Sequence, residues 1–296
     1  MLSKSIKDKV KGIVYQQLPV TELKPSPLRD SGEIYLTIAL KRSGQHTIIN
    51  WFCLQLKSAI HINECVFIRK DLSMMIASLP GRFVTYNNQE KIDTGYTGTN
   101  KDKKLLGTFF SKVGNVGSYP NIIYSFEDTQ LDDFYLKRFI HKYKPKVILI
   151  MRDPYNCLAS CFKHREGKNT LADLREKKYK LITYLEQSLE IEDYLKYPVL
   201  SINFNQWLIS KKYRQRILES LGIPFDNKLD DISLEEIPSF GGGSSFEGKE
   251  FEANKLKNRV FERWKSYASN TEYKNLLDDQ YLSYLSQSIF DFEKPF

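Results

Sequence analysis

Short aliphatic or aromatic segments alternate with longer segments of helical periodicity, and this alternation constrains the fold of the chain more than any other feature. The strand-like segments cover residues 33–40, 64–68, 121–126, 146–151 and 198–203. Helical patterns cover residues 47–60, 131–143, 170–194 and 205–221, and another helix begins at Asp153-Pro154. Strands separated by helices favour a parallel sheet with helices on both faces. We therefore predict a three-layer α/β/α fold with a central parallel sheet.

Two stretches interrupt this alternation. Residues 87–118 are rich in Asn, Gly, Thr and Lys and have little periodicity, so we predict an insertion or surface loop there. Residues 238–248 are rich in Gly and Ser, which is typical of a flexible connector. No other segment resembles a domain linker, so we expect one domain over residues 1–296 with its core over 33–270. Trp264 and the aromatic residues of 281–296 are expected in core helices.

The composition restricts the functional classes. Lys and Arg total 44 against 36 Asp and Glu, a net charge of +8, which admits nucleic acid, an acidic small molecule or solubility alone as its explanation. No zinc-finger spacing or RNA-binding aromatic signature accompanies the charge, so no nucleic acid partner is expected. The longest aliphatic run, residues 147–151, is too short to span a bilayer. With no secretory h-region and only four scattered cysteines, a reduced, cytoplasmic protein is expected.

A polar loop, Lys41-Arg42-Ser43-Gly44-Gln45-His46-Thr47, joins the 33–40 strand to the next helix. The backbone N–H groups and the dipole of a helix N-terminus suit a phosphate or sulfate. Gly44 permits close backbone approach, Ser43 and Thr47 add hydroxyl donors, and Lys41 or Arg42 adds full charge. This is not a Walker A loop, because Ala39 occupies the place of its first Gly and Gln45 follows the Gly of the loop. A simple turn is the alternative interpretation.

A second pattern follows the 146–151 strand. Arg152 stands at its carboxyl end, where open α/β sheets bind ligands, and Ser160 comes eight residues later in the next helix. An arginine and a hydroxyl that converge on one phosphate are a sensible arrangement. The alternative is that Arg152 is a salt-bridge partner at the helix start and that Ser160 has no role.

Both patterns resemble sulfotransferases that use 3′-phosphoadenosine 5′-phosphosulfate (PAPS). Many members carry Pro-Arg-Ser-Gly-Thr-Thr in the 5′-phosphosulfate loop; here Arg42, Ser43 and Gly44 match, while Lys41, Gln45 and His46 depart. Arg152-Asp153-Pro154 with Ser160 resembles the 3′-phosphate motif of the family. Residues 198–224 are similar to its late strand–helix segment. The usual Arg-Lys-Gly of the closing loop is missing, and the resemblance places the backbone of Gly241, Gly242, Gly243 and Ser244 at the 3′-phosphate instead.

The resemblance implies a P-loop-like sulfotransferase fold, PAPS as cofactor without a metal, and transfer of a sulfuryl group to a hydroxyl or amine. The acceptor is a small molecule or, by preference, a saccharide. Arg42 is expected to meet the charge on the leaving phosphate, and Glu127 is the expected general base. His46 is the rival base, and an exposed acid that caps a helix is the alternative interpretation of Glu127. A nucleotide or sugar kinase and a non-catalytic polyanion-binding protein are the alternative functions.

Other residues are expected to be structural or incidental. Cys157, Cys161 and His164 fall on one helical face, but three ligands on one helix make a weak zinc site, so packing of buried thiols is preferred. No metal site is therefore predicted. His61 and His141 look incidental.

Overall fold

A parallel sheet forms the centre of the computed structural model, which describes residues 16–18, 32–56, 58–63, 65–70, 73–78, 83–87, 90–94, 121–165, 170–235, 260–292 and 295. Its seven strands have the order β10-β9-β2-β8-β3-β6-β7. From β10 to β3 every neighbouring pair is parallel, while β6 and β7 add an antiparallel edge. These strands are β2 (Ile34–Ala39), β3 (Ser58–Ile62), β6 (Phe83–Asn87), β7 (Glu90–Thr94), β8 (Asn121–Glu127), β9 (Lys146–Met151) and β10 (Val199–Asn203).

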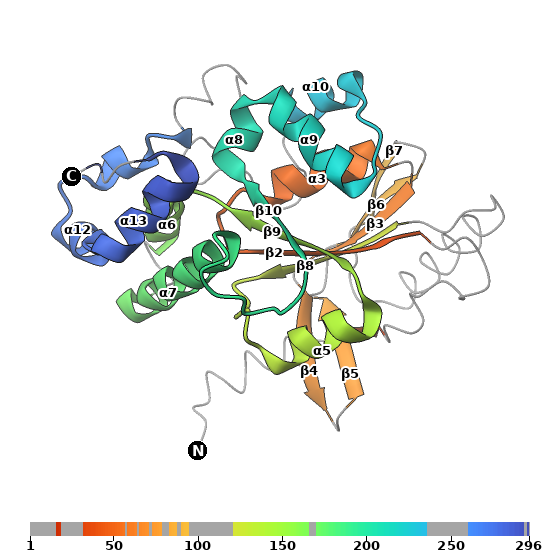
Figure 1. Cartoon of the computed structure of the whole chain (residues 1–296), viewed down its shortest axis with the longest axis horizontal. Helices are drawn as coiled ribbons and strands as arrows, with labels where there is room; N and C mark the ends of the chain where they lie inside the picture. The colour runs from red at the N-terminus through yellow and green to blue at the C-terminus, as the bar shows by residue number, and fades with distance from the viewer. Residues whose placement is uncertain are drawn as a thin grey trace.

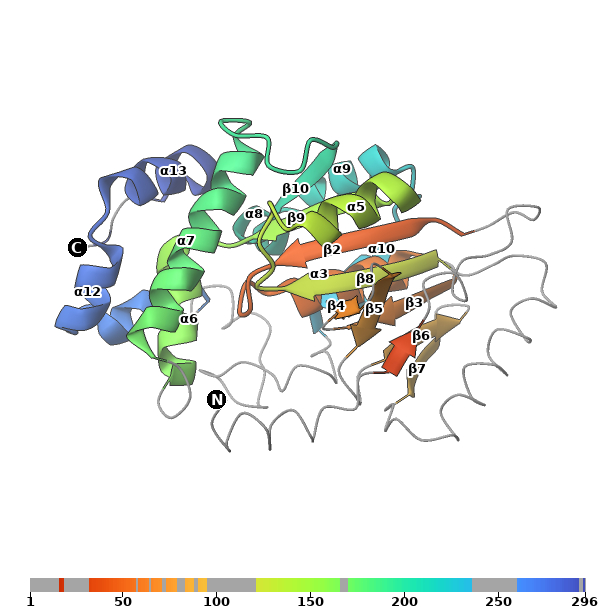
Figure 2. The same ribbon diagram turned by 90° about the horizontal axis from the view of Figure 1, so that it is seen from below.

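Helices cover both faces of this sheet, which confirms the predicted three-layer architecture (Figure 1). The described helices are α3 (Gln45–Gln55), α5 (Phe134–Tyr143), α6 (Pro154–Arg165), α7 (Leu171–Ser188), α8 (Phe204–Ile209), α9 (Lys211–Leu221), α10 (Asn227–Glu235), the 3₁₀ helix η1 (Arg263–Tyr267), α12 (Thr271–Leu277) and α13 (Gln280–Phe290). Viewed from below, β2 and β8 point toward α6 and α7, so the carboxyl edge of the sheet faces these helices (Figure 2).

The alternation of side chains along β2 divides the core in two. Leu36 and Ile38 face one cluster, which includes buried residues of α5, α6, α7, α12 and α13. Tyr35 and Ala39 face the other, which includes α3, α8 and α9. Because successive side chains of a strand point to opposite faces, a strand buried on both faces reads as an unbroken apolar run. This explains why the sequence pattern predicts the strand so clearly.

The helix boundaries follow from capping residues. Asp133 accepts hydrogen bonds from the N–H groups of Tyr135 and Leu136 and so caps α5. Thr170 and Asp173 form a capping box at the start of α7. Gly222, in the left-handed conformation with φ 73°, ends α9.

Several predicted boundaries are wrong. The helix predicted over 47–60 begins at Gln45 and ends at Gln55, and Ser58–Ile62 form the parallel strand β3. The helix predicted over 170–194 ends at Ser188. The segment 205–221 contains two helices rather than one, because Asn203 caps α8 and Ser210 both ends α8 and caps α9. Trp264 lies in the short 3₁₀ helix η1, not in a core α-helix.

The predicted strand 64–68 lies outside the central sheet. It is β4 (Cys65–Lys70), which pairs with β5 (Ser73–Ser78), and β5 also pairs with β1 (Gln16–Leu18) in a separate antiparallel sheet. At the start of the predicted insertion 87–118, β6 and β7 extend the central sheet as a hairpin. The residues 95–120 lie outside the described part of the chain.

A buried ion pair joins the helices on the α3 side. Arg214 of α9 donates from Nε and Nη2 to the two carboxylate oxygens of Asp230 of α10, at 2.7 and 2.8 Å. The indole of Trp51 of α3 donates to the same carboxylate at 2.9 Å. Since Asp230 and Arg214 are both buried, the loss of one partner leaves the other charged group buried without compensation.

We expect Asp230→Ala to lower the free energy of unfolding by about 3–5 kcal/mol, because Arg214 and Trp51 lose their acceptor. The matched control is Asp231→Ala, whose carboxylate is two-thirds exposed and pairs with Lys211 at 3.3 Å. It should cost less than about 1 kcal/mol. Urea denaturation of both variants measures the difference, and equal small losses would show that the buried pair does not hold these helices.

Candidate functional site

The parallel register brings the predicted site segments to one edge of the sheet. Ala39, near the end of β2, pairs with Glu127 on β8 and with Ile150 on β9. Asn203, the last residue of β10, pairs with Met151. The ends of β8, β2, β9 and β10 therefore lie side by side. Glu127 is at the end of β8, and the loop after β2, Arg152 and the start of α8 follow the other three strands. This is the edge at which open parallel sheets bind ligands.

The loop between β2 and α3 is a tight turn. The N–H of Ser43 donates to the carbonyl of Leu40 at 3.1 Å, and Arg42 has a φ of 76° in the left-handed region. Gly44 also lies in that region, with a φ of 88°, and precedes α3 without a side-chain cap. The first turn of any α-helix leaves backbone N–H groups without intrahelical acceptors. The predicted anion-binding geometry, a strand followed by a turn and a helix N-terminus, is therefore present.

The hydrogen bonding of the Ser43 hydroxyl indicates whether an oxyanion fits this loop. Its side chain is 1% exposed, and its Oγ has no hydrogen-bond partner within the described residues. A buried hydroxyl normally finds a partner, because leaving it unsatisfied costs about 1–3 kcal/mol. An oxyanion held by the loop would accept this hydrogen bond.

One aromatic ring connects the loop to the second motif. A Cβ added to Gly44 would overlap Phe204, with its ring carbons Cδ2 and Cζ at 2.7 and 2.8 Å. The guanidinium carbon of Arg152 lies 5.4 Å from the centroid of the same ring, within cation–π range. Phe204, the first residue of α8, thus lies against both predicted anion-binding segments.

The second motif is buried and is joined to a distant segment. Arg152 is 2% exposed and donates to the carbonyl of Val260. Ser160 Oγ accepts a hydrogen bond from Arg263 Nη1 at 3.3 Å. The structure therefore brings an additional arginine, Arg263, to the predicted hydroxyl. Sequence reasoning missed Arg263, and the adjacent Trp264 was only assigned to the core.

Asn156 fixes this return of the chain. Its Nδ2 donates to the carbonyl of Phe261 at 3.0 Å, and its Oδ1 accepts from the N–H of Trp264 at 3.3 Å. Asp153 holds Asn156 in turn, because its Oδ1 accepts from the backbone N–H of Asn156 at 2.8 Å. Through this contact Asp153 caps α6. Residues 260–264 are thereby positioned beside the start of α6.

Glu127 and His46 lie together at the other side of the loop. Glu127 Oε1 accepts from Gln45 Nε2 at 2.6 Å and lies 3.6 Å from His46 Nε2. The second carboxylate oxygen lies 3.6 Å from Lys41 Nζ. The Glu127 side chain is 9% exposed, so the alternative of an exposed helix-capping acid is wrong. Asp133 caps α5 instead. The structure thus places the two rival bases side by side.

Three buried residues extend this pair into the sheet, and sequence reasoning missed all of them. His61 Nε2 lies 2.8 Å from Ser125 Oγ, which donates to Asn63 Oδ1 at 3.0 Å. The same Asn63 oxygen lies 3.0 Å from His46 Nε2. Burial and the nearby His46 lower the pKa of His61 well below its usual range. His61 was expected to be incidental, and the strand β3 that carries it was not predicted.

The thiols of α6 are buried, as predicted, and one of them contacts the loop. Cys157 and Cys161 are both buried in the core, and Cys161 Sγ donates to the carbonyl of Lys41 at 3.4 Å. A hydrogen bond from Cys157 and the nearby Lys177 lower the pKa of Cys161 against the effect of burial. Lys177 also pairs with Asp128, whose Oδ1 accepts from the N–H of Lys41 at 2.9 Å. The side chain of His164 lies outside the described part.

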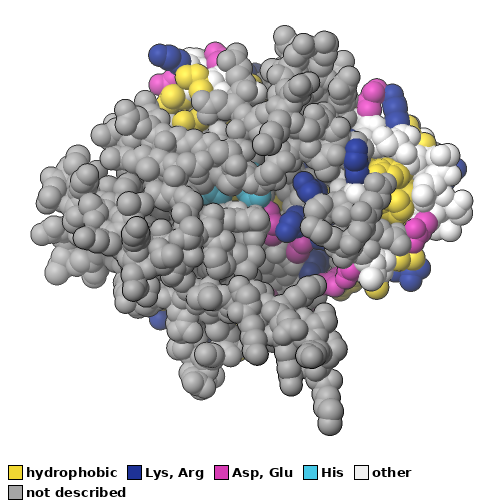
Figure 3. Space-filling model, turned by 180° about the vertical axis from the view of Figure 1, so that it is seen from behind, with side chains coloured by type: hydrophobic (Ala, Val, Ile, Leu, Met, Phe, Trp, Pro, Cys, Tyr) yellow, Lys and Arg dark blue, Asp and Glu magenta, His cyan; other side chains and the backbone are white. Residues whose placement is uncertain are grey.

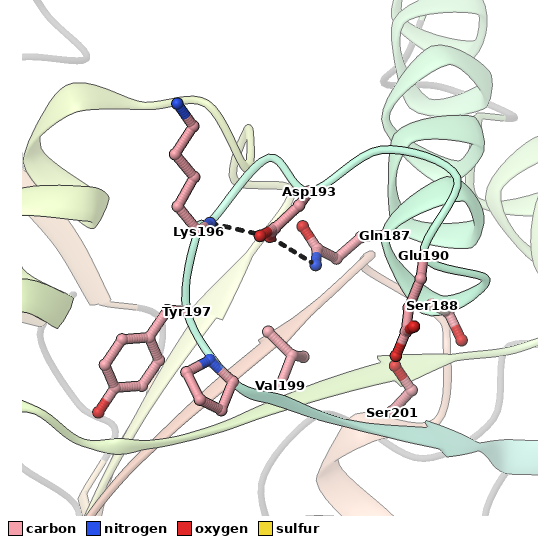
Figure 4. Close-up of a pocket in the computed structure, with 9 residues that line it drawn as sticks. Gln187, Ser188, Glu190, Asp193, Lys196, Tyr197, Val199 and Ser201 are labelled. Atoms are coloured by element: carbon pink, nitrogen blue, oxygen red, sulfur yellow. Dashed lines mark hydrogen bonds between the residues drawn. The ribbon is translucent and has the colours of Figure 1, made fainter.

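Histidine, acidic and basic side chains gather near the centre of the face opposite to that of Figure 1 (Figure 3). A cavity of about 530 Å³ lies elsewhere, between the end of α7 and the amino end of β10 (Figure 4). Its lining includes Gln187, Asp193 and Tyr197, and contains none of the predicted site residues.

The predicted 3′-phosphate loop, Gly241 to Ser244, lies outside the described residues. Within the described residues, no helix combines the length and apolar character needed to cross a bilayer.

Comparison with solved structures finds sulfotransferases at low similarity. The sulfotransferase domain of the Synechococcus PCC 7002 olefin synthase is 12% identical, with a TM-score of 0.47 over 95% of this chain and all of that domain. Mouse sulfotransferase SULT7A1, solved with PAP, is 12% identical, with a TM-score of 0.46 over 91% of this chain and 93% of that one. The sulfotransferase domain of the curacin biosynthetic pathway is 13% identical, with a TM-score of 0.46 over 90% of this chain and all of that domain.

No family model matches the sequence, and no curated protein matches it. All three solved structures are described as sulfotransferases. This is the family that the loop after β2 and the Arg152–Ser160 motif resemble. Similarity at this level carries no weight for the activity, which is inferred below from the residues of this chain.

Replacement of Gly44 by Ala tests the close approach of Phe204. We expect a larger loss of stability than for Gly222→Ala, which has the same left-handed backbone but no atom within 4 Å of its added Cβ. Left-handed strain of about 1–2 kcal/mol is common to both variants. Overpacking against Phe204 adds about 1–3 kcal/mol to the loss of unfolding free energy in Gly44→Ala.

Urea denaturation of the two glycine variants measures this difference. In a Phe204→Ala background, Gly44→Ala should cost no more than Gly222→Ala. Equal costs in the native background would contradict a clash with the ring.

Proposed function

We propose that this protein transfers a sulfuryl group from PAPS to a hydroxyl or amine acceptor, with a saccharide as the preferred acceptor class. The single observation that carries this proposal is the pair of arginine- and hydroxyl-containing segments at adjacent strand ends, both in contact with Phe204. A nucleotide with phosphate groups at both ends needs two such segments. A nucleotide phosphorylated at only one end does not.

The 5′ end is assigned to the loop after β2. Lys41, Arg42, Ser43, Gly44, Gln45, His46 and Thr47 form this segment. The helix N-terminus and the unsatisfied Ser43 hydroxyl support the assignment. Gln45 contributes through its backbone, because its side-chain amide donates to Glu127.

The 3′ end is assigned to Arg152, Ser160 and Arg263. Arg263 donates to Ser160 and so lies beside the hydroxyl, while Arg152 is held by Val260 and by the Phe204 ring. Two guanidinium groups recognise a phosphate dianion well, because each offers several donors in a fixed plane. Gly241, Gly242, Gly243 and Ser244 remain proposed as backbone donors to the same phosphate.

Sulfuryl transfer resembles phosphoryl transfer, in which positioning and charge stabilisation dominate. When bound, PAPS supplies the sulfuryl group and a leaving 5′-phosphate that takes the bonding electrons. Arg42 and Lys41 meet the charge on that phosphate. Glu127 accepts the proton of the acceptor hydroxyl or amine, and Gln45 holds its carboxylate in place at 2.6 Å. No residue of this scheme requires a metal ion.

Nucleotide selectivity is the first test. We expect adenosine 3′,5′-bisphosphate to raise the melting temperature more than ADP, without magnesium. Arg263→Ala and Ser160→Ala should weaken bisphosphate binding about 10- to 100-fold, because each removes a contact to a charged phosphate, and should leave ADP binding unchanged. Lys196→Ala, an exposed residue at the distant cavity, is the control.

Calorimetric titration of these variants gives the affinities. A metal-dependent preference for ADP would indicate a kinase. A response to neither nucleotide would indicate a polyanion-binding protein.

The base is tested by Glu127→Gln. Sulfuryl transfer from PAPS should fall about 10²- to 10⁴-fold, because the amide cannot accept the proton, while the bisphosphate dissociation constant stays within about twofold. The assay follows radiolabelled sulfuryl transfer to a panel of phenols, alcohols, amines and saccharides. Asp132→Asn, an exposed carboxylate in the turn that follows, should keep full turnover. Unchanged transfer by Glu127→Gln would remove Glu127 as the base.

A further inference from the structure

The contacts around Asn63 carry an inference that rests on, and deepens, the proposed function. Asn63 follows β3 directly, and the register of β3 with β8 pairs Ile62 with Tyr124. Asn63 therefore comes next to Ser125, and both side chains are fully buried, as is that of His61. Three polar side chains thus line up between the interior of the sheet and the catalytic candidates His46 and Glu127.

The protons in this chain of contacts can be counted. A hydroxyl has one proton, and Ser125 Oγ donates it to Asn63 Oδ1 at 3.0 Å. The ring nitrogen Nε2 of His61, 2.8 Å from the same hydroxyl, must then be a donor. Burial and His46 lower the pKa of His61 well below its usual range, so this ring is neutral near pH 7 with its proton on Nε2.

The hydrogen bonds of Asn63 also show which ring nitrogen of His46 carries a proton. An amide oxygen only accepts hydrogen bonds, and Asn63 Oδ1 lies 3.0 Å from His46 Nε2. His46 Nε2 must therefore carry a proton. The structure presents Oδ1 of Asn63 to both Ser125 Oγ and His46 Nε2, and the hydrogen bond donated by Ser125 favours this orientation of the amide.

We propose that Asn63, oriented by Ser125 and His61, is a positioning residue that keeps a proton on Nε2 of His46, the nitrogen that faces Glu127, and thereby leaves Glu127 as the proton acceptor on that side of the ring. The protonated nitrogen lies 3.6 Å from Glu127 Oε1, so its N–H dipole favours a carboxylate at that position. A His46 held in this form cannot take a proton at Nε2. On this side of the His46 ring, the choice between the two rival bases follows from a buried residue, Asn63.

Nitrogen-15 NMR of the full chain labelled at histidine tests the proposal without any ligand. We expect His46 to be protonated at Nε2 in the native protein. Asn63→Ala should convert it to a mixture of tautomers, and Asn63→Asp, which keeps an acceptor oxygen, should restore the native form. Ser125→Ala should also yield a mixture, because the Asn63 amide is then able to turn; this variant decides the matter if Asn63→Ala fails to fold.

Transfer kinetics provide the second readout. Asn63→Ala should lower kcat about 10- to 100-fold, as loss of an outer partner of a functional side chain typically does, with bisphosphate affinity within about twofold. Asn63→Asp should recover part of this loss. The control is Gln187→Ala, which removes another buried amide, paired with Asp193 and the N–H of Leu195 far from the site. It should change neither the tautomer nor kcat.

Two results would overturn the proposal: an unprotonated His46 Nε2 in the native protein, or an unchanged tautomer in both Asn63→Ala and Ser125→Ala. A native protein that shows the expected tautomer but neither binds the bisphosphate nor transfers sulfuryl would instead refute the proposed function. The His46 assignment would survive that result, because the NMR measurement uses no substrate.

Discussion

The position of β2 between β8 and β9 is the constraint on which the site depends. Parallel pairing on both sides of one strand places the ends of all three at the same edge. A slip of one residue would exchange the two faces of β2 and move Leu36 and Ile38 out of their core. The hydrophobic pattern that stabilises the sheet therefore also determines which polar residues meet beyond it.

Several polar side chains beyond that edge are at least partly buried and contact one another. Glu127 accepts from Gln45 and lies near Lys41 and His46, and Asp153 holds Asn156. Buried polar groups are tolerated when they are mutually satisfied, and such networks hold side chains in one arrangement. Side chains held in this way can stabilise charge that develops during a reaction without first having to move. Phe204 lies against both Gly44 and Arg152 and so connects the two motif segments.

Much of the central sheet could be predicted, and much of the site could not. The runs at β2, β8 and β9 are mostly apolar and buried on both faces, so local pattern suffices for them, and the branched residues of β10 make that edge strand recognisable too. β3 was missed because Ala59 and Ile60 were assigned to the end of the preceding helix, which was predicted over residues 47–60. That error concealed His61 and Asn63, whose partners depend on the pairing of β3 with β8. Arg263 was missed for a related reason, because its contact with Ser160 spans more than a hundred residues. Local spacing identifies a loop or a motif, but only the tertiary register brings the remaining groups to it.

The attachment of residues 260–264 to the start of α6 affects the order in which the molecule can be completed. The contacts run from Arg152 and Asn156 to backbone atoms of Val260, Phe261 and Trp264. A ribosome releases the central strands long before it releases this segment, and a nascent sheet can form without it. Until the last part of the chain returns, the guanidinium of Arg152 lacks its carbonyl partner and Ser160 lacks Arg263. The half of the site assigned to the second phosphate is therefore assembled late in synthesis, so a shortened chain could keep the sheet yet lose that half.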